Sequence, residues 1–97
     1  MEKKFNADLA AKIREAQTAA FVAIRVLANM GYDHVTYHFL GNRIEITVFE
    51  DTLEESENTK KLLDTFLEEG WTSVITERQL DSGDYFSYIE YDYTIED

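Results

Sequence analysis

The sequence predicts an α+β fold, a two-layer sandwich in which two helices cover one face of a four-stranded antiparallel sheet. Apolar residues recur every three or four positions in two segments and alternate with polar residues in four others. These segments follow the order α-β-β-α-β-β. Consecutive hairpins favour one antiparallel sheet with both helices on the same side. Residues 1–97 are expected to form a single domain.

The first helix is expected over residues 6–29. Asn6 or Asp8 can accept a hydrogen bond from a free amide of the first turn, and Gly31 can end the helix in a left-handed conformation. The apolar stripe that would face the sheet consists of Leu9, Ile13, Ala16, Ala20, Ile24 and Leu27.

Three further apolar residues of this helix, Phe21, Val22 and Val26, fall outside the stripe at 100° per residue. Two interpretations fit them. The second half of the helix is buried more deeply than the first, or the three side chains contact a second copy of the chain.

Two hairpins are expected from the alternating segments. The four strands span residues 35–40, 43–49, 71–78 and 85–94. Gly41-Asn42 joins the first pair, with glycine in the first position as a type II′ turn prefers. The polar loop 80–84 joins the second pair.

The second helix is expected to begin at a capping box formed by Thr52 and Glu55 and to run to about Glu69, where Gly70 ends it. Trp71 can fold back on its last turn. The apolar face of this helix comprises Leu62, Leu63, Phe66 and Leu67.

Acidic residues dominate the second half of the chain. Twenty Asp and Glu against nine Lys and Arg give a net charge of −11. Residues 50–97 alone hold fifteen acids and three bases, whereas residues 1–49 have a net charge of +1. Such a field repels nucleic acids and anionic membranes and attracts basic protein surfaces.

The sequence contains no pattern that indicates catalysis, a metal or a cofactor. There is no Cys, and no Ser lies in a nucleophile motif. His34 and His38 are four residues apart on an expected strand, roughly 13 Å, which is too far for one metal ion. The loop 81–84 lacks the alternating acids and closing Glu of a calcium loop. We therefore expect a non-enzyme that uses neither metal nor cofactor.

We expect the protein in the cytoplasm. No apolar run approaches the roughly 18 residues of a membrane span. The basic residues near the start are not followed by the apolar stretch of a secretory signal.

The acidic residues suggest a surface that binds a basic partner, although they can also be a solvated face that only keeps the protein soluble. Acids at alternate strand positions stand about 6.6 Å apart, close to the phosphate spacing of two nucleotides. The candidate partner-binding residues are Glu54, Glu55, Glu57, Asp81, Asp84, Tyr88, Glu90, Asp92, Glu96 and Asp97.

In its size, its lack of Cys and its acidic aromatic segment Tyr85–Asp97, the chain resembles the small acidic inhibitors made by phages, which include DNA-mimicking anti-CRISPR and anti-restriction proteins. The resemblance is one of class and rests on no shared motif. It implies a non-catalytic inhibitor acting in the bacterial host cytoplasm. Its partner would be a nucleic-acid-binding protein or complex with a basic groove.

Two alternatives remain. A small acidic homodimeric adaptor, similar to a secretion chaperone, would bind a protein client through the apolar helix surface at Phe21, Val22 and Val26. A regulatory domain that binds a small ligand would show an apolar cavity.

Overall fold

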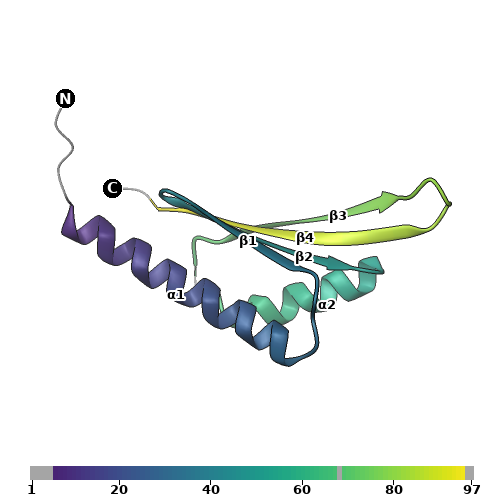
Figure 1. The fold of residues 1–97 in the computed structure, drawn as a ribbon, viewed down its shortest axis with the longest axis horizontal. Helices are drawn as coiled ribbons and strands as arrows, with labels where there is room; N and C mark the ends of the chain where they lie inside the picture. Colours follow the sequence, from purple (N-terminus) through teal and green to yellow (C-terminus); the bar gives the residue numbers. More distant parts are fainter. Residues whose placement is uncertain (1–5, 68, 96–97) are drawn as a thin grey trace.

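The computed structural model describes residues 6–67 and 69–95, and it confirms the expected order of helices and strands. Both helices lie on the same side of an open four-stranded sheet (Figure 1). In the described part of the chain, neither helix is long and apolar enough to cross a membrane. The elements are α1 (Ala7–Asn29), β1 (Val35–Leu40), β2 (Arg43–Glu50), α2 (Leu53–Leu63), β3 (Thr72–Gln79) and β4 (Tyr85–Thr94).

The strand order in the sheet is β1-β2-β4-β3, and all neighbouring strands are antiparallel. The second hairpin therefore joins the first through β4, which pairs with β2 on one side and β3 on the other. As a result, β1 and β3 form the two edges and the acidic, aromatic strand β4 lies in the interior of the sheet.

Helix α1 begins and ends at the expected residues. Asn6 caps its start by accepting a hydrogen bond from the Leu9 amide at 3.0 Å. At its end the Tyr32 amide donates to the Leu27 carbonyl and the Gly31 amide to the Ala28 carbonyl. This double closure is a Schellman motif, which requires the positive φ of 95° that Gly31 adopts.

The first hairpin turn also follows the prediction. Gly41 has a φ of 63°, and among the described residues none other than glycine has a positive φ. A positive φ at the first turn residue alone distinguishes a type II′ turn from type I′.

The expected extent of α2 was wrong, because the helix ends at Leu63 and not near Glu69. The hydroxyl of Thr65 donates to the Leu62 carbonyl at 2.6 Å, the acceptor that the Phe66 amide would use in a continuing α-helix. The Phe66 amide bonds instead to Leu63, three residues earlier. The chain thus tightens and leaves the helix about six residues before the sequence pattern indicates.

The core lies between the helices and the covered face of the sheet. Small side chains on α1 let this helix approach β2, while α2 packs on β4. Each fully buried Leu or Ile contributes about 1.5–3 kcal/mol. The buried hydrophobic residues are Ala16, Ala20, Ala23, Leu27, Ile44, Ile46, Val48, Leu63, Leu67, Ile89, Tyr91 and Ile95.

Candidate functional site

The face of the sheet away from the helices is uncovered (Figure 1). Side chains alternate along each strand, so the residues between the buried ones point to this side. On β4 these are Phe86, Tyr88, Glu90 and Asp92, as the sequence pattern predicts. We define the open face as these four residues, the diagonal neighbour Arg43 of Asp92, and the cross-strand partners Glu45, Thr47, Phe49, Thr72, Val74, Thr76 and Arg78.

One half of the open face is aromatic. Phe49 and Tyr88 are cross-strand partners on β2 and β4, and their ring centroids are 5.5 Å apart. Phe86 stacks on Tyr88 at 6.1 Å. Val74 on β3, paired with Glu90, is 61% exposed. The sheet therefore presents a flat apolar area directly beside its carboxylates.

The other half of the open face is acidic but partly neutralised. Asp92 on β4 lies opposite Glu45 on β2. Arg43 donates from Nε and Nη2 to both Asp92 oxygens, and its Nη2 also lies 3.6 Å from a Glu45 oxygen. The hydrogen bond and charge of Asp92, followed by the charge of Glu45, raise the pKa of Arg43. Glu90 is exposed and lies beyond this pair, across a shallow hollow of about 200 Å³.

The structure divides the candidate partner-binding residues between separate places. Tyr88, Glu90 and Asp92 share the open face. Asp81 and Asp84 lie in the β3–β4 loop. The last two, Glu96 and Asp97, lie outside the described residues.

The remaining candidates, Glu54, Glu55 and Glu57, are exposed near the start of α2, on the helical side of the sheet. At this helix start, the expected capping box forms in a modified way. The Glu55 amide donates to the Thr52 hydroxyl, and that hydroxyl donates to the Glu55 carboxylate.

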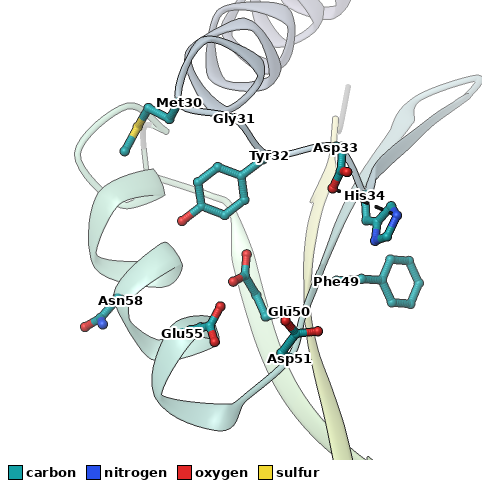
Figure 2. Close-up of a pocket in the computed structure, with 10 residues that line it drawn as sticks. All are labelled: Met30, Gly31, Tyr32, Asp33, His34, Phe49, Glu50, Asp51, Glu55 and Asn58. Atoms are coloured by element: carbon teal, nitrogen blue, oxygen red, sulfur yellow. Dashed lines mark ion pairs between the residues drawn. The ribbon is translucent and has the colours of Figure 1, made fainter.

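Glu55 also borders a cleft of about 560 Å³ between the end of α1 and the β2–α2 junction, shown in Figure 2. Three acids that the sequence analysis did not single out line the same cleft: Asp33, Glu50 and Asp51. Their signal was weak, because Asp33 and the adjacent pair Glu50-Asp51 are far apart in the chain and border one cleft only after folding.

A hydrogen-bonded chain runs behind this cleft from Tyr32 through Thr59 to Glu50. The Thr59 hydroxyl donates to Glu50 at 3.3 Å, so the Tyr32 hydroxyl, 3.0 Å away, is the donor to Thr59. Burial, together with a hydrogen bond and repulsion from Glu55, raises the pKa of Glu50 above its ordinary value. Within residues 6–67 and 69–95, no group of three or more His, Cys, Asp or Glu could hold a metal ion.

A second cleft, of about 460 Å³, lies between α1 and the Trp71 region. Ala16, Ala19, Trp71 and Tyr93 form apolar walls, and Lys12 lies among the polar lining residues. The two aromatic rings are 5.1 Å apart. Four of its eight lining residues are polar, and a small-ligand interpretation would place its ligand here.

The helix residues considered for a dimer contact do not share one environment. Phe21 is 49% and Val22 50% exposed, while Val26 is half-buried. Deeper burial is thus the wrong interpretation for the first two. Phe21 packs edge-on against Tyr37 and Phe39 of β1, at centroid distances of 5.7 and 5.2 Å.

The sequence matches no protein-family model, and neither a curated protein nor a solved structure is significantly similar to this chain. Function is therefore argued from the geometry of these surfaces.

Proposed function

We propose that the protein is a non-catalytic inhibitor that binds the basic groove of a nucleic-acid-binding protein or complex through its open face. The observation that carries the proposal is the composition of β4, whose uncovered side presents two aromatic rings and then two carboxylates. Because β4 lies inside the sheet, this surface is held by strands on both sides.

Arginine is the partner side chain that fits such a surface best. Its planar guanidinium stacks on aromatic rings and donates paired hydrogen bonds to carboxylates. A groove that binds nucleic acid offers several Arg and Lys side chains in a row. Tyr88 can take the stacking contact and Glu90 the hydrogen bonds, while the field of a chain with net charge −11 speeds association.

In this proposal the acids act in place of phosphates, as in anti-CRISPR and anti-restriction proteins. Glu90 and Asp92 occupy alternate positions of one strand, so they stand about 6.6 Å apart, near the length of two nucleotide steps. Because Arg43 already pairs with Asp92, Glu90 would make the stronger contact with the partner. The partner would be a bacterial nuclease or surveillance complex, met in the host cytoplasm.

A pull-down from bacterial lysate at about 50 mM and about 500 mM salt tests the proposal, since the Debye length falls from roughly 14 to roughly 4 Å. We expect a nucleic-acid-binding protein at low salt only, and we expect added DNA to displace it. Glu90→Lys should weaken binding about tenfold or more, the effect of about 1.4 kcal/mol. Glu15→Lys, an equal charge change at an exposed position of α1, is the matched control. Capture that ignores both salt and DNA would refute the proposal.

The exposed apolar side chains of α1 favour one other function, that of an adaptor that binds a protein client. Val22, half exposed on a surface that contributes little to the core, is the observation that supports it. Val22→Lys would then abolish capture of the client, whereas Glu90→Lys would leave it unchanged. The inhibitor proposal predicts the opposite pattern for the same two variants.

A further inference from the structure

The edge strand β1 presents a row of unpaired backbone groups. The Phe49 amide donates to the His34 carbonyl at 3.0 Å, which identifies this as a hydrogen-bonded pair. Bonded and non-bonded pairs alternate along an antiparallel ladder. The continuous register from Val35–Val48 to Leu40–Arg43 then directs the backbone groups of Val35, Tyr37 and Phe39 away from β2, toward the open edge.

This edge lacks the features that normally prevent strands from pairing with each other. β1 contains no Asp, Glu, Lys, Arg or Pro, and its register with β2 has no bulge. By contrast, the other edge strand, β3, carries Glu77 and Arg78. Proteins usually protect edges with charges, prolines or bulges, and an unprotected edge is a template for another strand.

The side chains beside the edge are apolar and exposed. Tyr37 is 45% and Leu40 54% exposed, and Phe21 of α1 packs on Tyr37 and Phe39 to form a three-ring cluster. The α1 residues that flank Phe21 on this side of the helix are Gln17, Arg25 and Ala28, so no acidic residue lies among them. The chain has a net charge of −11, but its acidic residues do not cluster at this surface, so two copies would repel each other less here than across its acidic surfaces.

We propose that a second copy of this chain pairs with β1, antiparallel, about a two-fold axis that passes beside Tyr37. In this register Val35 lies opposite Phe39 of the second copy and Tyr37 lies opposite itself. All three outward-facing residues of each strand then form hydrogen-bonded pairs. The two sheets join into one sheet of eight strands, and the two three-ring clusters meet across the axis. A self-matching surface of this kind is what a two-fold dimer requires.

The pairing does not rest on the proposed function, and its test is independent of any partner. Because the chain has no Cys, a single introduced cysteine reports one distance. In a hydrogen-bonded pair the two Cα atoms are about 5.5 Å apart, within the range that a disulfide spans. Tyr37→Cys should therefore form a disulfide-linked dimer under mild oxidation.

Val35→Cys and Phe39→Cys are the matched controls. Each cysteine would lie four residues from its own counterpart along the strand, about 13 Å, and should stay reduced. Mixing these two variants should produce the crosslinked heterodimer. Equal crosslinking of Val35→Cys alone would overturn the proposed register.

Sedimentation of the unaltered chain tests the dimer without any substitution. We expect twice the 11.3 kDa of one chain at high micromolar concentration. Tyr37→Lys should return the protein to the monomer, while Val74→Lys, an exposed change on the other edge strand, should not. A monomer at every concentration tested would overturn the proposal, as would a dimer that Tyr37→Lys leaves intact.

Discussion

Arg43 and Asp92 join the two inner strands of the sheet on its open face, although 49 residues separate them in the chain. Arg43 pairs in register with Thr94, so Asp92 is its diagonal neighbour on β4. The ion pair removes one carboxylate from those that a basic partner could use.

Arg43→Gln should strengthen binding of a basic partner, because it releases the charge of Asp92 on the open face. We expect a several-fold gain in affinity at low salt, measured by titration calorimetry, and a smaller gain at high salt. Thermal stability should fall slightly, since Glu45 and Asp92 then face each other unscreened. Arg25→Gln, which removes an exposed cation from α1, should leave the affinity nearly unchanged. Weaker binding by Arg43→Gln would contradict the assignment of this face.

Glu50→Gln should raise the stability of the protein at neutral pH. Burial, with a hydrogen bond and repulsion from Glu55, raises the pKa of Glu50 in the folded state. When a carboxyl group has a higher pKa in the folded than in the unfolded state, its protonated form stabilises the fold at pH values below the unfolded-state pKa. This stabilisation is lost as the pH rises through the folded-state pKa. The variant should therefore gain most over the unaltered protein at pH 7 and least near pH 4, as measured by urea denaturation. Glu54→Gln, an equal change at an exposed position of α2, is the control.

Tyr91→Phe should lower the free energy of unfolding by about 1–3 kcal/mol, the range for a buried hydrogen bond with a charged acceptor. The Tyr91 hydroxyl lies 3.1 Å from the Lys60 carbonyl and 2.7 Å from the Asp64 carboxylate. Tyr85→Phe removes an exposed hydroxyl and should change stability by less than about 0.5 kcal/mol. Equal losses in the two variants would show that the hydroxyl of Tyr91 contributes nothing.

The same contact predicts acid sensitivity at Asp64. Burial raises the pKa of Asp64, but hydrogen bonds from Lys60 and Tyr91 outweigh it and the net shift is downward. When a carboxyl group has a lower pKa in the folded than in the unfolded state, its ionised form stabilises the fold at pH values above the unfolded-state pKa. This stabilisation is lost as the pH falls through the folded-state pKa. Asp64→Asn should therefore reduce the loss of stability below about pH 4, the ordinary range of an Asp carboxyl. Asp84→Asn, in the exposed loop, is the control.

Gly70→Ala should destabilise the protein more than Gly83→Ala. Both glycines have similar positive φ values, 99° and 94°, so the backbone strain of an added side chain is nearly equal, roughly 1–2 kcal/mol. A Cβ at Gly70 would lie 2.9 Å from the Tyr93 ring, whereas one at Gly83 would meet nothing within 4 Å. The difference between the urea unfolding midpoints of the two variants measures the effect of the contact with the Tyr93 ring alone. Fluorescence of Trp71, which packs on Tyr93, should change only in Gly70→Ala.

The local features of this fold could be predicted from the sequence, because each depends on residues close together in the chain. Asn6 sets a helix start through its side-chain oxygen, and Gly31 and Gly41 set a helix end and a turn through their backbones. The alternation in β4 correctly separated the buried Ile89 and Tyr91 from the exposed side.

The pairing of distant segments could not be predicted in the same way. The position of β4 between β2 and β3 depends on contacts across the whole chain, and so does the neutralisation of Asp92 by Arg43. The early end of α2 coincides with hydrogen bonds from the hydroxyl and the amide of Thr65 to the Leu62 carbonyl, which the sequence pattern does not show. These features decide which carboxylates of the acidic half remain available to a partner.

The strand order has a consequence for how the protein is made. One side of β2 can pair with β1 as soon as both strands have been synthesised. Its other side stays unpaired until β4 is synthesised, which happens after α2 and β3 have been translated. At 5–20 residues per second, residues 51–94 take roughly 2–9 s to emerge. During that time the nascent chain exposes the apolar residues Ile44, Ile46 and Val48 beside an open strand edge. Synthesis at high density therefore favours aggregation of unfinished chains, and a lower expression level, with fewer chains in synthesis at once, should raise the yield of folded protein.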